Sequence, residues 1–392
     1  MKTLGISPRL LLLSLLIAGL GLFHIQATAN WVEYWIPDGQ QEQDKTDNGQ
    51  RMQVVLLLDT SNSMDGLIEQ AKSQLWSILV ALSQTRKKGE APELEMALYE
   101  YGNAGLTMRS GYVRQVLPFT SDMDEVSAAL FRLSTNGGQE YCGEVIQHAL
   151  KNLKWSKHEE AVRLAFIAGN EGFDQGNTPY GSVCAEAKER DIIVNTIFCG
   201  SCPQGEQLFW KDGAVLTGGH YNCMNQNKAT VYIETPYDQR LAELNAELNQ
   251  TYLPYGKQGL TKQRLQKAQD SNAGEYGLSN AANRAAFKAS SSYKNASWDL
   301  VDAYEEDPSV LEEAEALPKE LAGKSQTAIE EHLKEVQAKR ARIQKEMQQI
   351  NEKRSAYIET ARSKQQNTDS DLEASVLDAI RAQAAAKGFK TE

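Results

Sequence analysis

The sequence predicts an α/β fold: a doubly wound, mainly parallel six-stranded sheet followed by an α-helical C-terminal region. Three observations support this fold class. The run 54–58 is continuously apolar, which is typical of a strand covered by helices on both faces. Strand-like and helix-like patterns alternate from residue 51 to about residue 256. From residue 325 to about residue 366, the chain is rich in strong helix formers.

The elements of residues 51–256 follow one another in a regular order. Residues 65–86 carry apolar side chains on one side at helical spacing, whereas residues 94–101 alternate like a half-buried strand. In the resulting order two strands follow each other directly, as a doubly wound sheet with one antiparallel edge strand would produce. We expect strands at 54–58, 94–101, 111–119, 162–167, 192–198 and 218–222, and helices at 65–86, 122–133, 143–153, 181–190, 206–212 and 237–252.

Beyond residue 256 the composition changes. Residues 257–297 are rich in Gln, Ala, Ser and Asn and poor in large apolar side chains, which indicates a partly helical linker. The segment 298–304 has the apolar residues to dock back on the core. We therefore expect a linker at 257–297 and a helical, coiled-coil-like extension at 298–392, with a last short helix at 372–386.

A heptad pattern marks the long helix of this extension. Apolar or aromatic residues recur every seven positions from Ile329 to Tyr357, but Arg340 and Arg354 occupy two of the four companion positions. A buried arginine weakens a self-associating seam. Self-association through this helix, a helical hairpin and packing of the helix on its own domain therefore all stay open.

The net charge of the chain limits the kinds of partner it can bind, and its first residues indicate the cellular compartment. The formal net charge of −11 disfavours nucleic acid, because phosphate binding needs clustered Lys and Arg. Residues 1–29 have the pattern of a signal peptide, with Lys2 and Arg9 before an apolar stretch and a small-x-small site at its end. The stretch is shorter than the ~20 residues that span a bilayer, so cleavage is favoured over an uncleaved anchor. We expect an exported protein, periplasmic or secreted, without stable membrane insertion after cleavage, and a linker at 30–50.

Export also affects how the five cysteines are interpreted: Cys142, Cys184, Cys199, Cys202 and Cys223. In an oxidising compartment they favour disulfides, and their odd number leaves at least one free or paired between chains. The segment Cys199-Gly-Ser-Cys202 also matches a redox pair or half of a zinc site. It follows a predicted strand, however, and lacks a second C-x-x-C, so structural disulfides are favoured.

The residues after the first predicted strand are the most informative part of the chain. Asp59, Ser61 and Ser63 offer one carboxylate and two hydroxyls at alternate positions, at the carboxyl end of a buried strand. Oxygen ligands with few charges suit Mg²⁺ or Mn²⁺, which keep open positions for water or a partner. The alternative is that the serines cap the following helix. Their combination with Asp59 after a buried strand favours metal binding.

This D-x-S-x-S motif resembles the metal-ion-dependent adhesion site (MIDAS) of von Willebrand factor A-type domains, the fold also found in integrin I domains. The order of elements in residues 51–256 is similar to that of the family as well. The resemblance implies a Rossmann-like sheet, a bound Mg²⁺ (or Mn²⁺ or Ca²⁺) and a protein ligand that docks over the metal. It also implies that Cys142, Cys184, Cys199 and Cys202 lie at the same edge of the sheet. We expect the pair Cys142–Cys184, and Cys223 bonded to Cys199 or Cys202.

The chain departs from the family pattern at two further metal ligands. The family has a Thr after a Gly-Gly turn, where this chain has Gln139 and Glu140, and an Asp after the next parallel strand, where this chain has Asn170 and Glu171. We expect Glu140 and Asn170 to complete the site. If Glu171 joined Asp59 and Glu140 there, three carboxylates would over-neutralise the ion and weaken its attraction for an acidic partner.

An enzymatic function fits these residues less well than a binding function does. A phosphatase that uses Asp59 as nucleophile would need a second Asp where Ser61 stands, and no G-x-S-x-G elbow with a placed His is present. We therefore expect no enzyme but an exported protein-binding module that uses a divalent cation at Asp59, Ser61 and Ser63. The alternatives are a metal-independent scaffold that binds through its helical tail and a Mg²⁺-dependent phosphotransfer enzyme.

Overall fold

A computed structural model of the chain describes residues 49–225, 227, 232–313, 317–364 and 372–391. The chain divides into two units, Met1–Lys45 and Thr46–Glu392, and every described residue belongs to the second. The expected signal peptide and residues 30–48 of the expected linker lie outside the described residues. Among the helices of the described ranges, none is long and apolar enough to cross a membrane.

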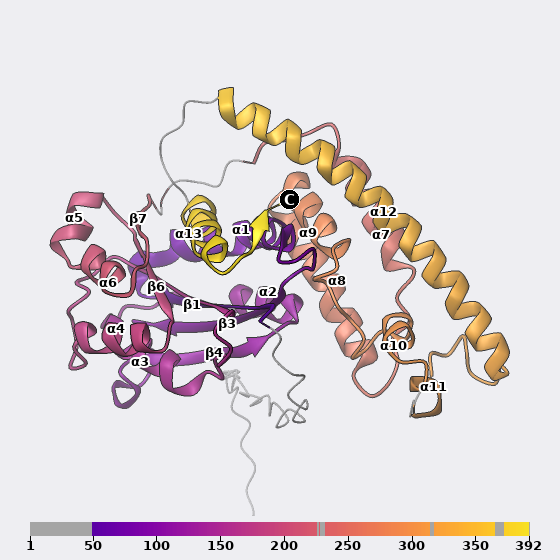
Figure 1. The fold of residues 1–392 in the computed structure, drawn as a ribbon, viewed down its shortest axis with the longest axis horizontal. Helices are drawn as coiled ribbons and strands as arrows, with labels where there is room; N and C mark the ends of the chain where they lie inside the picture. The colour runs from indigo at the N-terminus through magenta and orange to yellow at the C-terminus, as the bar shows by residue number, and fades with distance from the viewer. Residues whose placement is uncertain (1–48, 226, 228–231, 314–316, 365–371, 392) are drawn as a thin grey trace, which may run out of the picture. The chain divides into compact units, whose positions relative to one another are not determined.

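One sheet of six strands organises the α/β part, in the order β4-β3-β1-β5-β6-β7 (Figure 1). β4 pairs with β3 in antiparallel fashion, and the other neighbouring strands are parallel. The predicted fold class and its antiparallel edge strand are therefore confirmed. The strands are β1 (Arg51–Asp59), β3 (Glu93–Tyr101), β4 (Val113–Thr120), β5 (Val162–Gly169), β6 (Ile193–Phe198) and β7 (Tyr221–Cys223).

Helices cover both faces of this sheet, because successive apolar residues of β1 point to opposite sides. Val54 and Leu58 belong to one apolar cluster, which also contains residues of α1 (Asp65–Ser83) and α2 (Met123–Phe131). Val55 and Leu57 belong to a second cluster on the other face. The helices that contribute to this second cluster are α3 (Cys142–Asn152), α4 (Tyr180–Glu189) and α6 (Trp210–Thr217).

The segment between β6 and β7 differs in detail from the sequence prediction. Two helices, α5 (Cys202–Gln207) and α6, replace the single short helix expected at 206–212. β7 begins at Tyr221 rather than at residue 218. Gly218 ends α6 in a left-handed conformation with φ of 76°, which a glycine adopts without steric cost, and the chain needs two more residues to reach the sheet.

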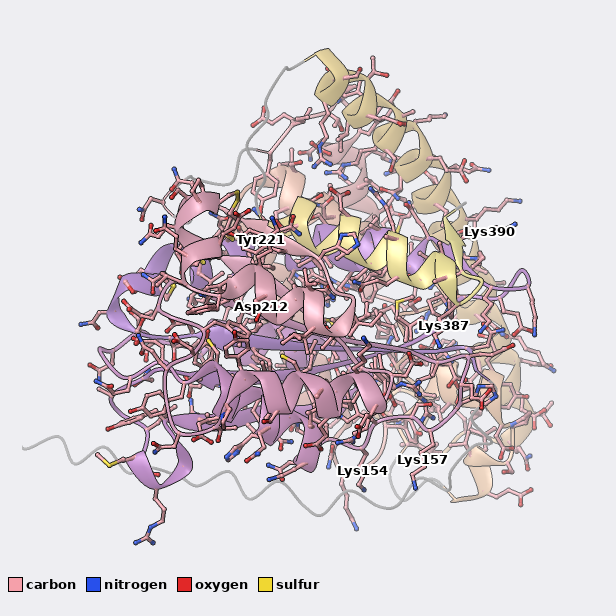
Figure 2. All side chains as sticks on the ribbon, turned by 60° about the vertical axis from the view of Figure 1, so that its left-hand side comes forward. Lys154, Lys157, Asp212, Tyr221, Lys387 and Lys390 are labelled. Carbon is pink, nitrogen blue, oxygen red and sulfur yellow. A yellow bond between two sulfur atoms is a disulfide. The ribbon has the colours of Figure 1, made fainter. Side chains whose placement is uncertain are left out.

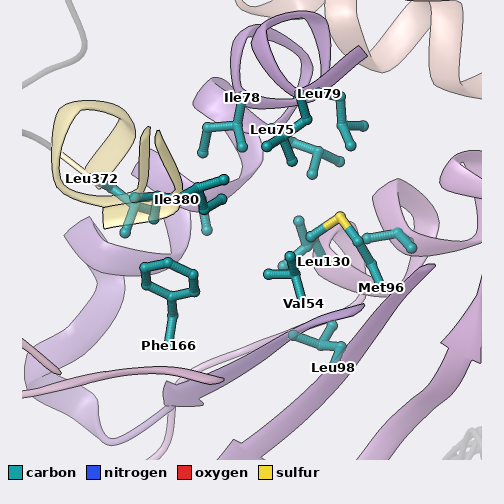
Figure 3. Packing of buried hydrophobic residues seen from close by; sticks show 14 of the residues in the cluster. Val54, Leu75, Ile78, Leu79, Met96, Leu98, Leu130, Phe166, Leu372 and Ile380 are labelled. Atoms are coloured by element: carbon teal, nitrogen blue, oxygen red, sulfur yellow. The ribbon is translucent and has the colours of Figure 1, made fainter. Parts of the chain in front are cut away.

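The helix expected at 372–386 is confirmed as α13 (Leu372–Ala386), and it covers part of the sheet. Leu372 and Ile380 join the same apolar cluster as Val54 and Phe166, as Figure 3 shows. After α13, β8 (Lys390–Thr391) pairs with β2 (Thr85–Arg86) in a second, two-stranded sheet. Residues 372–391 are therefore part of the core of the α/β layer rather than an appendage.

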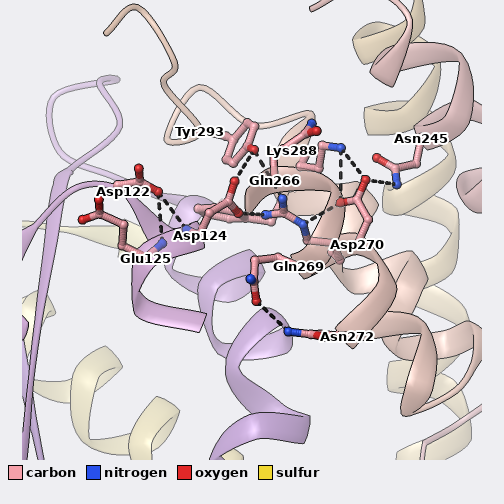
Figure 4. Close-up of polar contacts among 12 residues, drawn as sticks. Asp122, Asp124, Glu125, Asn245, Gln266, Gln269, Asp270, Asn272, Lys288 and Tyr293 are labelled. Carbon is pink, nitrogen blue, oxygen red and sulfur yellow. Dashed lines mark hydrogen bonds and ion pairs between the residues drawn. The ribbon is translucent and has the colours of Figure 1, made fainter. Parts of the chain in front are cut away.

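Residues 257–297 form packed helices, which corrects their expected role as a linker. They hold α8 (Gly259–Glu275) and α9 (Leu278–Lys288), and α9 packs against α1 and against α7 (Asp238–Asn249). Composition misled the interpretation because charged side chains take the place of large apolar ones. Arg284 and Lys288 are fully buried and paired with Asp270 (Figure 4 shows Asp270 and Lys288).

The heptad positions of the long helix α12 (Gln326–Lys364) face the rest of their own chain. Ile343 and Met347 pack in one cluster with residues of α7 and α9, and Ile329 and Leu333 in another with α10 (Leu300–Glu306). The segment 298–304, which was expected to dock back on the core, packs in these two helical clusters instead of on the sheet. A short helix, α11 (Val310–Glu313), precedes α12. Of the alternatives for this helix, packing on its own domain is thus the observed one, and these seam positions are buried within the chain.

Buried aspartates explain the two arginines of the seam. Arg340 forms ion pairs with Asp299, at 2.6 Å, and with Asp302. Arg354 pairs with Asp238 at 2.6 Å. Because each guanidinium has a carboxylate beside it, both arginines can be buried at positions where a coiled coil requires apolar side chains.

Candidate metal centre

Asp59, the last residue of β1, lies at the carboxyl edge of the sheet between β3 and β5. The loop that follows is fixed by backbone hydrogen bonds, with Thr60 N–H donating to Tyr101 O at 2.9 Å and Met64 N–H to Ser61 O at 3.0 Å. Met64 is completely buried and anchors the far end of the loop. Ser61 N–H donates to Asp59 Oδ1 at 2.8 Å, so the loop wraps around the carboxylate.

Three of the predicted ligands form a chain of polar contacts beside Asp59. The hydroxyl oxygens of Ser61 and Ser63 lie 3.2 Å apart, and Asn170 Nδ2 donates to Ser63 Oγ at 3.2 Å. Ser61 stands at the N-cap position of the short turn η1 (Asn62–Met64), yet within the described residues its side chain makes no capping hydrogen bond. The arrangement is that of a shared polar site rather than that of a helix cap.

Glu140 reaches the same place from the loop before α3. A Cβ added to Gly102 would be 2.8 Å from Asp59 Oδ1 and 2.9 Å from Glu140 Cγ, so both side chains lie close to Gly102 and to each other. Glu140 is buried, whereas the neighbouring Gln139 is exposed and accepts a hydrogen bond from Tyr141. The structure thus brings together all five predicted residues: Asp59, Ser61, Ser63, Glu140 and Asn170.

Burial and neighbouring carboxylates disfavour the negative charge of Asp59. Burial is the main cause that raises the pKa of this carboxyl to about 7; the Ser61 hydrogen bonds oppose this shift, and the carboxylates of Glu140 and Glu171 contribute to it. Burial and the charge of Glu171 also raise the pKa of Glu140. Within the described part of the chain, Asp59 Oδ2 is buried and accepts no hydrogen bond. An orphaned buried oxygen of this kind fits a cation.

The donor set fits a hard divalent cation. Carboxylate, hydroxyl and amide oxygens converge from the loops after β1 and β5 and before α3, and such oxygens suit Mg²⁺, Mn²⁺ or Ca²⁺. Among the described residues, no three His, Cys, Asp or Glu side chains cluster as metal ligands. The candidate centre therefore depends on the hydroxyl and amide oxygens of Ser61, Ser63 and Asn170 as much as on its carboxylates.

The sequence analysis did not identify two residues next to Asp59 that shape this site, Gly169 and Tyr101. A Cβ added to Gly169 would lie 2.5 Å from Tyr101 Oη and 3.1 Å from Asp59 Oδ2, so only glycine leaves room for the carboxylate. Tyr101 donates from Oη to Ala168 O at 3.1 Å and is completely buried. The available signal was a glycine at the end of a predicted strand, which often marks a close backbone approach.

The cysteines around the site follow only one of the two expected pairings. Cys202 and Cys223 form a disulfide, with their Cα atoms 5.3 Å apart, as one of the two expected alternatives for Cys223. The expected pair Cys142–Cys184 is wrong: in the described part of the chain both are free, buried thiols, as is Cys199. Cys142 contacts Tyr101 Oη through its sulfur at 3.8 Å instead. Burial raises the pKa of Cys142, of Cys184 and of Cys199, which keeps these thiols protonated.

Several solved structures are similar to this chain over less than half of its length. BatB from Bacteroides thetaiotaomicron is 17% identical with a TM-score of 0.34, over 44% of this chain and 90% of that one. The SpRpn10 VWA domain is 15% identical with a TM-score of 0.33, over 44% and 88%. Proximal thread matrix protein 1 of the mussel byssus, with a zinc-occupied MIDAS motif, is 11% identical with a TM-score of 0.35, over 45% and 42%.

Comparison with family models gives a direct assignment for part of the chain. No curated protein matches the sequence. The model of the von Willebrand factor type A domain matches residues 53–206, which contain all five residues of the candidate centre. This range begins in β1 and ends in α5, and so covers five of the six strands of the main sheet. Residues 53–206 of this chain are therefore a von Willebrand factor type A domain.

Proposed function

We propose that the type A domain binds a divalent cation, Mg²⁺ or alternatively Mn²⁺ or Ca²⁺, and uses it to bind a partner protein. The observation that carries this proposal is the buried, unpaired Asp59 Oδ2 beside the linked side chains of Ser61, Ser63 and Asn170. A carboxylate in such a place is stabilised by a positive charge, and type A domains commonly supply one as a metal ion.

Each residue has a distinct part in this proposal. Asp59 provides the negative charge, Ser61 and Ser63 provide neutral oxygens, and Glu140 adds a second carboxylate from the loop before α3. Asn170 holds Ser63 by its amide group and orients the hydroxyl. The bound ion supplies a fixed positive charge at the carboxyl edge of the sheet, where a partner's oxygen can meet it.

Calorimetric titration of the full chain with Mg²⁺, Mn²⁺ and Ca²⁺ tests the metal. Asp59→Ala and the isosteric Asp59→Asn should both abolish the heat of binding, and Asn170→Ala should weaken affinity by about 10–100-fold. Asp378→Ala serves as a matched control, since Asp378 lies on the exposed side of α13. A wild-type chain that folds but binds none of the three ions would refute the proposal.

We also propose that the protein is exported and is not an enzyme. Export is supported by the signal-like pattern of residues 1–29 and by the Cys202–Cys223 disulfide, since disulfides persist mainly in oxidising compartments. Fractionation of cells with an antibody against the chain tests its location. Turnover of a generic phosphate ester with Mg²⁺, lost in Asp59→Asn, would instead favour phosphotransfer.

A further inference from the structure

The charges around the candidate metal centre are almost all of one sign. The loops that build it, residues 59–66, 134–144 and 170–176, contain six carboxylates and no Lys or Arg: Asp59, Asp65, Glu140, Glu144, Glu171 and Asp174. Asp65 and Glu144 lie in the first turns of α1 and α3, where the helix dipole compensates part of their charge. The other four lie outside these first turns.

The positions of these carboxylates agree with this excess of negative charge. Glu140 lies close to Asp59, since a Cβ added to Gly102 would be 2.8 Å from Asp59 Oδ1 and 2.9 Å from Glu140 Cγ. Glu171 directly follows Asn170, whose Nδ2 donates to Ser63 Oγ at 3.2 Å. Asp59 is the buried, unpaired group that points to a bound cation. Two positive charges on that cation do not balance four carboxylates, so the edge stays negative after the metal binds.

The opposite edge of the sheet is different. Lys154 follows α3 and Lys387 follows α13, and Figure 2 shows both of them, with Lys157 and Lys390, to the right of Asp212. The amino edge thus carries both signs of charge: Asp191 pairs there with Lys387 at 2.8 Å, and Glu160 with Lys87 at 3.2 Å. An excess of one sign is therefore found at the carboxyl edge, where the acidic loops contain no Lys or Arg.

Exposed apolar and aromatic side chains flank the acidic loops. Met108 is 75% exposed beside them, in the loop 102–112, which adds one basic residue, Arg109. Phe209 is 43% exposed, and its neighbour Trp210 donates from Nε1 to Glu171 O at 2.7 Å. Tyr180 lies against Phe209, with 6.1 Å between the ring centroids. Aromatic faces next to carboxylates attract Lys and Arg side chains by cation–π interaction.

We propose that the partner presents a basic segment, with Lys or Arg next to an apolar residue, and not the carboxylate that a residual positive charge on the metal would capture. This inference rests on the proposed metal-assisted binding and specifies its partner. The metal then holds the loops and meets a neutral oxygen, while the surrounding carboxylates attract the basic side chains. A partner carboxylate would face Glu140 and Glu171, which repel it.

Fluorescence anisotropy of labelled peptides on the full chain, saturated with Mg²⁺, tests the proposal. Short Gly/Ser peptides of equal length carry a central Lys-Phe-Lys, Glu-Phe-Glu or Ser-Phe-Ser. We expect the Lys peptide to bind at least about tenfold more tightly than the Glu peptide, with a preference that weakens as salt is added. Glu171→Gln should reduce this preference, whereas the control Glu189→Gln, at the far end of α4, should leave it unchanged.

The possible results distinguish this inference from the proposed function on which it rests. Equal binding of the three peptides, tighter binding of the Glu peptide, no binding of the Lys peptide, or an unchanged preference in Glu171→Gln overturns the basic partner. Calorimetry with Mg²⁺ on the same samples shows whether the metal site itself is present. Intact metal binding with any of those results refutes the partner's charge alone, while absent metal binding refutes the proposed function.

Discussion

Arg284 of α9 and Asp124 of α2 form a fully buried ion pair, with 2.6 Å between Nη1 and Oδ1. This contact joins the helical region to the type A domain. The guanidinium also lies 4.3 Å from the centroid of the Trp76 ring on α1. Tyr293 donates from Oη to Asp124 Oδ2 at 2.8 Å, so the carboxylate has a second partner (Figure 4).

Removal of Asp124 should destabilise the whole described unit, because it leaves a buried guanidinium short of one counter-charge. We expect Asp124→Ala to lower the free energy of unfolding by about 3 kcal/mol, the lower end for a broken buried pair, since Asp270 still contacts Arg284. Urea denaturation of the variant measures it. The exposed Asp378→Ala should change stability by less than about 0.5 kcal/mol. A loss for Asp124→Ala no larger than that would contradict the structural role of the pair.

Acid should weaken the same network through Asp270. Burial opposes its ionisation, but the charges of Lys288 and Arg284 outweigh burial and hold the pKa of this carboxyl well below its ordinary value of 3.8. Burial lowers the pKa of Lys288 to about 8, which leaves the ammonium largely charged at neutral pH. Because the folded carboxyl binds its proton less readily than the unfolded one, its contribution is complete above the ordinary pKa and is lost as pH falls below it.

Denaturation at several pH values checks this contribution. The stability difference between the wild type and Asp270→Asn should be largest near neutral pH and should shrink as the pH falls below about 4. A stability difference between the two proteins that stays constant as the pH falls below about 4 would show that Asp270 is not ionised in the folded state.

The packing of α13 predicts a large loss of stability for a small truncation outside the candidate metal centre. Ile380 is 1% exposed and lies in the cluster with Val54 and Phe166. Ile380→Ala should destabilise the fold by about 2–5 kcal/mol, from lost burial and the cavity left behind. Arg381→Ala, one residue later and on the exposed side, is the control. Equal melting temperatures for the two variants would mean that α13 does not cover the sheet.

Thiol counting tests the cysteine arrangement. Without reduction, the denatured chain should react with a thiol reagent at three cysteines, Cys142, Cys184 and Cys199, and the folded chain at almost none because all three are buried. Cys202→Ser should lower stability by about 3 kcal/mol, as expected for opening a loop with a sequence separation of 21. A single reactive thiol in the denatured chain would instead indicate a second disulfide.

Gly169 offers a test of how tightly the metal centre is built. A methyl group there would meet Tyr101 Oη and Asp59 Oδ2, so Gly169→Ala should displace the carboxylate and weaken Mg²⁺ binding at least about tenfold. Gly181→Ala is a matched control, because nothing lies within 4 Å of an added Cβ at that position. Calorimetry that finds the same affinity in both variants would show that Asp59 does not need this space.

The sheet could be predicted from sequence because its signals are local. Val54 to Leu58 are adjacent and uniformly apolar, and such a run identifies a buried strand without knowledge of its neighbours. The D-x-S-x-S motif is equally local. Asn170 was predicted through the family resemblance, which implies a ligand after the next parallel strand, and it lies 107 residues from Ser63 in the sequence.

The features that could not be predicted from the sequence depend on ion-pair partners that are distant in the chain. Arg340 and Arg354 weakened the heptad interpretation, since no local pattern shows that Asp299 and Asp238 neutralise them. Arg284 and Lys288 likewise made residues 257–297 resemble a linker, although their ion pairs bury them completely. Charged residues can be buried only with a counter-charge, and a periodicity of apolar residues does not reveal it.

The place of α13 has a consequence for how the chain reaches its native state. The backbone of Leu372 donates to Gln70 Oε1 of α1 at 3.4 Å, across 302 positions of sequence. During synthesis, β1 and α1 emerge long before the helix that shields them, so their apolar side chains stay exposed until residues 372–391 are made. The α/β layer is therefore closed only after residues 372–391 have been made, although its first strand and helix are made about 300 residues earlier.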